Sequence, residues 1–254
     1  MCDATCQETA RPVSFFATPF GRTTTALLTM VLWGSALPVT KLAYHALDIS
    51  RSDMFLQFEF AGYRMVLGAM LLLVPAIIST RSLPVLNRKA VYAVARIGFF
   101  QTFLQYLLIA VGVALSTGTE ASLISGTITF FQLGLAHLRY ADDRMTARKV
   151  YAALIGFSGI LLFNMLSYGS LSVPGPGEIL LVVAMFVAAM GNLLSKEAAN
   201  SILPVLPLTG LQMLFGGLGL VAVGAWKTGV TPFYFSVKSV LILGYLSLVS
   251  ALGF

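Results

Sequence analysis

Eight predominantly apolar stretches, separated by short polar connections, run through this chain from residue 24 to residue 254. A helix that crosses a bilayer needs ~20 such residues. Only 10% of the residues are charged, whereas soluble domains average about 25%, so a water-soluble globule is excluded. The sequence therefore predicts an all-α polytopic membrane protein. The predicted helices are Thr24–Tyr44, Phe55–Ile78, Val91–Leu115, Ala121–Leu138, Val150–Leu166, Ile179–Ser195, Val205–Trp226 and Ser239–Phe254.

Basic residues occupy alternate connections between the predicted helices. Lys and Arg in short loops accumulate on the cytoplasmic side, and the intervening turns STGT and SYGSLSVPGPG contain neither. We therefore expect residues 1–23 to form a cytoplasmic tail, in a multi-pass protein of the bacterial cytoplasmic (inner) membrane. The net charge of +6 then reflects orientation and implies no nucleic-acid partner. The basic residues of this side are Arg11, Arg22, Arg81, Arg88, Lys89, Arg96, Arg139, Arg144, Arg148 and Lys149.

Three segments recur in the same order in the two halves of the chain. VLWGSALPVTKLA aligns with VAAMGNLLSKEA, which places Lys41 opposite Lys196. RMVLGAMLLLV aligns with QMLFGGLGLVA, which places Arg64 opposite Gln212, and TFLQY aligns with SALGF at the same offset of 148 residues. A repeat unit of five helices contains an odd number of spans, so its second copy would lie inverted in the membrane, as in many secondary carriers.

These segments resemble the EamA-type transporters of the drug/metabolite transporter superfamily. The similarity extends to GFFQTFLQYLLIAVGVALSTGTEASLISG and to DDRMTARKVYAALIGFSGILLF, and it covers residues 24–254. The resemblance implies a bundle of ten helices built from two five-helix repeats. It assigns residues 24–166 to the first repeat and residues 177–254 to the second.

The second repeat breaks off in its third helix when it is set against the family pattern. The last apolar block has 16 residues, which gives ~24 Å of helix at ~1.5 Å per residue, against a hydrocarbon core of ~30 Å. We therefore expect about 8 of 10 transmembrane helices, in a fragment or truncated product. A natural eight-helix form is the alternative.

Arg64 is a charged residue near the middle of a predicted span. Such a group costs about 2.5–3.5 kcal/mol even on the lenient insertion scale, so it should face the interior of the bundle. Gln57 and Gly68 fall on the same helical stripe. Arg64 is either a cavity cation that pairs with an anionic or zwitterionic solute, or a packing contact that holds helices together.

Two carboxylates are candidates for ion coupling. Glu59 lies roughly 140° around the helix from Arg64 at 3.6 residues per turn, so a place in a helix interface competes with a proton-coupling role. Glu120 follows STGT, and an acidic residue in the first turn complements the helix dipole. Thr117 or Thr119 would then cap that helix.

Polar stripes on several helices either line a water-accessible cavity or form hydrogen bonds between helices. Trp33 and Ser35 stand beside Pro38 in the first helix, where a kinked backbone fits a moving carrier. Lys41 is expected to reach the outer interface. The candidate solute-binding residues are Trp33, Ser35, Arg64, Gln101, Gln105, Tyr106, Ser122, Ser125, Thr129 and Asn192.

Enzyme signatures are missing from the sequence. His45 and His137 lie far apart, and no acidic or histidine cluster surrounds Cys2 and Cys6, so no metal or other cofactor is expected. We expect a secondary active transporter of a small metabolite or drug that works by alternating access with an ion gradient. The alternative is a non-transporting membrane scaffold or sensor subunit. The expected partners are a small solute and the lipid bilayer, and a homodimer is left open.

Overall fold

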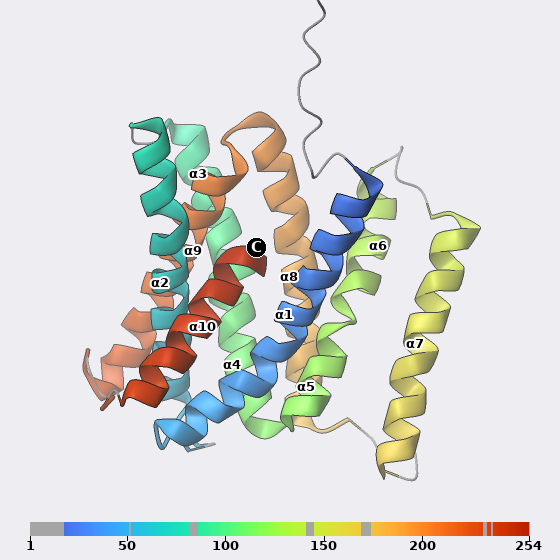
Figure 1. Cartoon of the computed structure of the whole chain (residues 1–254), viewed down its shortest axis with the longest axis horizontal. Helices are drawn as coiled ribbons and strands as arrows, with labels where there is room; N and C mark the ends of the chain where they lie inside the picture. The colour runs from blue at the N-terminus through green and yellow to red at the C-terminus, as the bar shows by residue number, and fades with distance from the viewer. Residues whose placement is uncertain are drawn as a thin grey trace, which may run out of the picture.

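The fold is a bundle of helices, with no β-strand in the described residues (Figure 1). The computed structural model describes residues 18–50, 52–81, 86–140, 145–168, 174–230, 233–234 and 236–253. Cys2, Cys6 and most of the predicted tail lie outside these ranges. The helices are α1 (Pro19–Ala46), α2 (Met54–Thr80), α3 (Arg88–Ile97), the π-helix η2 (Gly98–Leu104), α4 (Gln105–Leu115), α5 (Gly118–Ser125), α6 (Ile128–Arg139), α7 (Ala147–Tyr168), α8 (Pro176–Ser201), α9 (Val205–Thr228) and α10 (Val237–Gly253).

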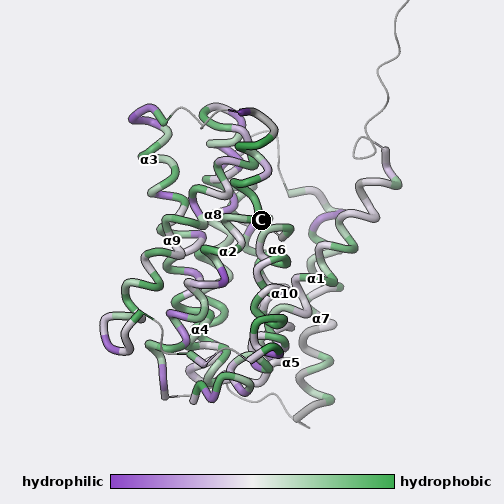
Figure 2. The backbone as a smooth tube through the Cα atoms, turned by 60° about the vertical axis from the view of Figure 1, so that its left-hand side comes forward, coloured by the Kyte–Doolittle hydropathy of each residue, from purple (hydrophilic) through white to green (hydrophobic). Residues whose placement is uncertain are grey.

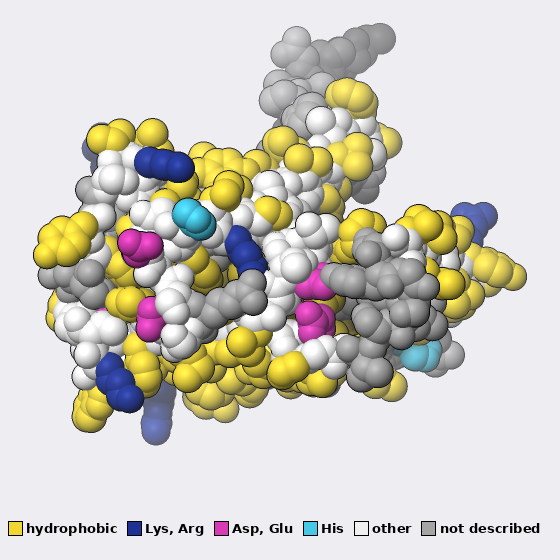
Figure 3. All heavy atoms as spheres, turned by 90° about the horizontal axis from the view of Figure 1, so that it is seen from below, with side chains coloured by type: hydrophobic (Ala, Val, Ile, Leu, Met, Phe, Trp, Pro, Cys, Tyr) yellow, Lys and Arg dark blue, Asp and Glu magenta, His cyan; other side chains and the backbone are white. Residues whose placement is uncertain are grey.

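The helices alternate in direction, so that α1, α3, α7 and α9 begin at the end of the bundle where α2, α6 and α8 finish (Figure 1). We call this end the basic end. Its described basic side chains are Arg81, Arg88, Lys89, Arg96, Arg139, Arg148, Lys149 and Lys196. Viewed from the opposite end, hydrophobic side chains form much of the rim, and a few Lys or Arg, Asp or Glu and His side chains lie among backbone and uncharged polar groups (Figure 3). The charge asymmetry behind the predicted orientation is thus present in the fold.

Apolar residues run along most of each helix, and hydrophilic residues lie at the helix ends and at several points inside the bundle (Figure 2). Six helical segments among the described residues are long and apolar enough to cross a membrane: Pro19–Ala46, Met54–Ile78, Arg88–Leu115, Gly118–Arg139, Pro176–Ser201 and Val205–Thr228. The other two predicted spans correspond to α7 and α10. The apolar part of α10, Val237–Leu252, is shorter than a span requires. The protein is therefore polytopic, and the number of spans stays a prediction.

The first helix begins at Pro19, five residues before the predicted Thr24. Thr18 caps it, because its hydroxyl oxygen accepts a hydrogen bond from the Gly21 amide at 3.0 Å. Proline at the first helical position has a backbone angle that already suits the helix and lacks only an N–H that would be unpaired there. The apolar pattern that set the prediction does not reveal this cap.

Two of the predicted helices are interrupted. The predicted Val91–Leu115 is divided by the π-helix η2. The predicted Ala121–Leu138 is broken between α5 and α6 at Gly126 and Thr127, whose amides bond to carbonyls only three residues back. The Thr127 hydroxyl also donates to the Ile124 carbonyl at 2.6 Å. Local side-chain bonds of this kind compete with a regular helix, so one uninterrupted helix was the wrong prediction here.

Glycines bring α2 and α9 into close contact at the centre of the bundle. A Cβ at Gly62 would lie 2.6 Å from Val221 Cγ2, and a Cβ at Gly217 would lie 2.9 Å from Met65 Cβ. Small residues allow membrane helices to approach this closely and gain van der Waals contact. The glycines of α9 therefore serve packing.

Replacing Gly217 with leucine should destabilise the protein, because overpacking a close helix contact costs about 1–3 kcal/mol. Thermal unfolding of the detergent-solubilised protein measures the effect, with Gly244→Leu as the matched control. A Cβ at Gly244 on α10 meets nothing within 4 Å, so this variant should unfold close to the wild-type temperature. Equal midpoints for the two variants would show that the α2–α9 contact does not limit stability.

Candidate functional site

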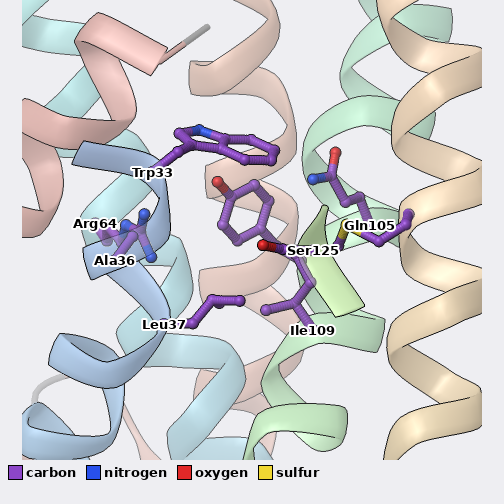
Figure 4. A pocket seen from close by; sticks show the side chains of 9 residues that line it. Trp33, Ala36, Leu37, Arg64, Gln105, Ile109 and Ser125 are labelled. Carbon is purple, nitrogen blue, oxygen red and sulfur yellow. The ribbon is translucent and has the colours of Figure 1, made fainter. Parts of the chain in front are cut away.

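A small cavity lies between α1, α2, α4, α5 and α8 (Figure 4). Its volume is about 20 Å³, enough for roughly one water molecule. Arg64 and Gln105 stand on opposite sides of it, with Trp33 above them in the view of Figure 4. The lining residues are Trp33, Ala36, Leu37, Arg64, Gln105, Tyr106, Ile109, Ser125 and Met185.

Arg64 is buried, with 4% of its surface exposed. Its Nε donates to the Ser250 hydroxyl at 2.7 Å and to the Leu246 carbonyl at 3.2 Å, and its Nη1 lies 3.4 Å from Thr40 Oγ1. The guanidinium carbon also stands 5.5 Å from the centre of the Tyr106 ring. Arg139–Glu197 is the one ion pair among the described residues, so no carboxylate among them neutralises Arg64. A positive charge therefore remains beside the cavity.

Gln105 faces the cavity from α4 and is 1% exposed. Its side-chain oxygen has no hydrogen-bond partner within the described part of the protein. A buried acceptor left unpaired costs about 1–3 kcal/mol, so an ordered water or a solute with a donor group would stabilise this position. The cavity thus combines a cation and a free acceptor with the aromatic rings of Trp33 and Tyr106.

Gln101, one helical turn from Gln105, is engaged by α8. Its side-chain oxygen accepts a hydrogen bond from the Ser195 hydroxyl at 2.7 Å, and its amide nitrogen bonds to the Asn192 side chain. A Cβ at Gly191 would lie 2.5 Å from Gln101 Cβ, so α8 passes very close at this point. Neither Gln101 nor Asn192 lines the cavity. Polar stripes were expected either to line a cavity or to form hydrogen bonds between helices. Gln101 and Asn192 form hydrogen bonds between helices.

The polar stripe predicted for the fourth helix is divided by the break at Gly126. Ser125 lines the cavity, whereas Thr129 is exposed on α6. The Ser122 hydroxyl donates to the Gly34 carbonyl of α1 at 3.2 Å. Proline at position 38 cannot supply the helix hydrogen bond that this carbonyl would otherwise accept, so Ser122 compensates for the proline.

Three further predicted residues have contacts away from the cavity. The Ser35 hydroxyl donates to the Leu32 carbonyl at 2.7 Å and lies 2.7 Å from the Tyr245 hydroxyl of α10. Lys41 donates from its ammonium nitrogen to the Ser116 carbonyl, at the end opposite the basic end. Glu120 forms a capping box with Thr117, which confirms the predicted helix cap.

Glu59 is fully buried between α2 and α9. Its carboxylate accepts hydrogen bonds from the Tyr63 hydroxyl at 2.9 Å and from the Thr228 hydroxyl at 2.7 Å. It does not line the cavity. In the described ranges, no group of three or more His, Cys, Asp or Glu side chains is arranged to hold a metal ion.

The structure brings five of the predicted residues to one cavity: Trp33, Arg64, Gln105, Tyr106 and Ser125. The sequence prediction missed the apolar lining, namely Ala36, Leu37, Ile109 and Met185. Alanine, leucine, isoleucine and methionine are common throughout membrane-spanning helices. The sequence therefore gives no signal that separates these four lining residues from lipid-facing ones. Ser250, the nearest partner of Arg64, was missed for a different reason: it lies 186 residues away in the chain.

Comparison with known proteins gives a consistent result. The profile of the EamA-like transporter family matches residues 23–165. The chain is 25% identical over 232 residues to the uncharacterized transporter YetK of Bacillus subtilis (strain 168), covering 89% of this chain and 67% of that protein. It is 26% identical over 241 residues to the uncharacterized transporter YvbV of the same organism, covering 91% and 73%. No solved structure matches the chain significantly.

The family match covers more than half of the 254 residues, and it includes α2 with Arg64 and α4 with Gln105. Apolar helices and a buried polar centre are what a membrane carrier requires. The chain therefore belongs to the EamA-like transporter family, within the drug/metabolite transporter superfamily.

Proposed function

We propose that this protein is a secondary active transporter that moves a small anionic or zwitterionic metabolite or drug across the cytoplasmic membrane by alternating access. The observation that carries the proposal is the pairing of Arg64 and Gln105 across one cavity. A carboxylate on the solute would neutralise the guanidinium, and a donor group would satisfy the free amide oxygen. Trp33 and Tyr106 would supply aromatic contact area.

Contacts that recur at an offset of 148 residues support a duplicated architecture. A Cβ at Gly68 would lie 3.5 Å from Ser250 Cβ, and a Cβ at Gly216 would lie 2.4 Å from Thr102 Cβ. Gly216 is Gly68 shifted by 148 positions, and Ser250 is Thr102 shifted by the same number. The same contact thus occurs once between α2 and α10 and once between α9 and η2.

A second pair of contacts follows the same rule. Arg64 donates to the Leu246 carbonyl, and a Cβ at Gly98 would lie 2.8 Å from the Gln212 carbonyl oxygen. Shifting Arg64 and Gly98 by 148 residues gives Gln212 and Leu246. The counterpart helices α2 and α9 run in opposite directions (Figure 1), which supports an inverted repeat with units at 24–166 and 177–254. Inverted repeats around a central site are the usual basis of alternating access.

Arg64→Ala should lower solute transport in proteoliposomes by at least tenfold, because the cavity loses its positive charge. Uptake and efflux of a panel of carboxylate-containing metabolites measures the effect. Gln212→Leu is the matched control, since Gln212 occupies the corresponding position in the second half, is buried, and lies away from the cavity. Wild-type protein that is correctly inserted yet moves no solute would favour the scaffold or sensor alternative. Equal transport by Arg64→Ala and wild type would remove Arg64 from the solute site.

Gln105→Leu should separate stability from transport. The substitution removes a buried acceptor that has no hydrogen-bond partner among the described residues. The solute-free protein should therefore gain about 1–3 kcal/mol of stability and unfold at a higher temperature. Transport should fall, because the solute loses its acceptor. Gln101→Leu provides the contrast: it breaks the bonds to Asn192 and Ser195 and should lower the unfolding temperature. A Gln105→Leu protein that is less stable than wild type would contradict the assignment.

Glu59 is the better of the two coupling candidates, because an ionisable group inside a membrane span is costly to bury and usually has a functional role. Glu120, in contrast, already caps a helix. Glu59→Gln retains the shape and the contacts with Tyr63 and Thr228 but cannot exchange a proton. It should equilibrate solute down its gradient and fail to accumulate solute against it when a pH gradient is applied. Accumulation at the wild-type level would assign Glu59 to helix packing.

A further inference from the structure

A cleft at the basic end of the bundle lies outside the site described above. It consists of two adjoining hollows, of about 310 and 390 Å³, between α3, α6 and α8. Arg96, Leu194 and Glu197 line both hollows, which makes them one continuous cleft. Its volume far exceeds the roughly 20 Å³ of the central cavity.

Basic side chains dominate the charge of this cleft. Lys89 and Arg96 line it from α3, and Arg139 lines it from α6. Glu197 is the one carboxylate among the lining residues, and it is paired with Arg139 at 2.9 Å. Within the described residues, Lys89 and Arg96 form no ion pair. Two positive charges in the cleft are therefore left for an anion.

The rest of the cleft is apolar. Its walls carry long aliphatic or aromatic side chains from all three helices: Tyr92, Ile97, Leu135, Leu138, Leu193 and Leu194. A site for a small free anion has no need of such walls. A ligand that carries a charged head on a hydrocarbon chain matches both parts of the cleft.

The cleft continues into an exposed apolar face of α8. Ile179, Val183 and Phe186 are exposed, at 54%, 44% and 40%, and they repeat at the three- and four-residue spacing of one helix face. Met190 and Leu193 continue that face into the cleft. A lipid chain lying along this face of α8 would therefore reach the cleft without crossing the protein.

The depth of the basic residues fits a lipid phosphate. The span Arg88–Leu115 contains 28 residues, whereas a hydrocarbon core of ~30 Å takes up ~20 at ~1.5 Å each. If Leu115 is taken as the far edge of the core, about 20 helical residues reach back to Arg96. Lys89, seven residues earlier, then lies ~10 Å further out, among the headgroups. A phosphate at the boundary would lie between the two cations.

We propose that this cleft binds an anionic phospholipid, with Lys89 and Arg96 holding its phosphate and the walls of α3, α6 and α8 holding the start of an acyl chain. Basic pockets between membrane helices are a recurrent form of headgroup recognition. The lipid belongs to the leaflet that surrounds the basic end. It would connect α3 to α6, which both line the cleft.

The test is lipid titration of the full chain in dodecyl maltoside micelles, with bound lipid counted by native mass spectrometry. Palmitoyl-oleoyl phosphatidylglycerol should bind wild-type protein, and the complex should persist under collisional activation in the mass spectrometer. The phosphatidylcholine with the same acyl chains should not bind in this way. The double variant Lys89→Gln with Arg96→Gln should weaken phosphatidylglycerol binding by about 10- to 30-fold. The charge-matched control is Arg81→Gln with Arg148→Gln, which alters two exposed residues at the same end outside the cleft and should bind like wild type.

A second variant tests the acyl contact without changing any charge. Ser201 is exposed in the lining of the cleft, so Ser201→Trp should fold, fill the apolar space and reduce phosphatidylglycerol binding. Equal binding of the two lipids, or equal loss in the double variant and its control, would overturn the proposal. Displacement of the lipid by glycerol 3-phosphate at equal concentration would also overturn it, because it would show a site for soluble phosphates.

Discussion

A guanidinium buried in the membrane-spanning region is the constraint on which the centre of this fold depends. Placing such a charge in a span costs about 2.5–3.5 kcal/mol, and the cost is offset only if polar groups surround it. Arg64 recruits them from α1 through Thr40 and from α10 through Ser250 and the Leu246 carbonyl. Two helices far apart in the sequence are thereby held against α2. None of these partners is anionic, so the charge itself stays available to a solute.

The close contact of α2 with α9 supplies the rigid frame around this charge. Gly217 and Gly62 let the two backbones touch, and the helices are related by the 148-residue offset that also maps Arg64 onto Gln212. The charged member of the pair faces the cavity, and the neutral member is buried, with no hydrogen-bond partner for its side-chain oxygen among the described residues. In the proposed duplication, divergence of this kind would produce a single charged site from two equivalent positions, which suits a carrier that binds one solute at a time.

The sequence predicted the helical class and several local features because those depend on neighbours in the chain. The cap formed by Thr117 and Glu120 needs only two suitable residues three positions apart, and it is present. Whether Gln101 or Gln105 faces the cavity depends on how closely α8 approaches at Gly191. The sequence of η2 and α4 carries no information about that approach. A hydropathy pattern also does not reveal the π-helix or the break at Gly126. Both are changes in backbone hydrogen bonding, and such changes leave the order of apolar and polar residues unaltered.

A cavity this small suits a transport function only when the helices that line it can bend. Three of these helices have an irregular backbone directly beside a lining residue. Leu37 lines it and precedes Pro38; Ser125 lines it and precedes the break at Gly126. Gln105 lines it and follows the last residue of the π-helix. Prolines, helix breaks and π-turns are the usual places where helices kink. Bending at these three points would widen the cavity from the sides of α1, α4 and α5 while the glycine contact between α2 and α9 held Arg64 in place.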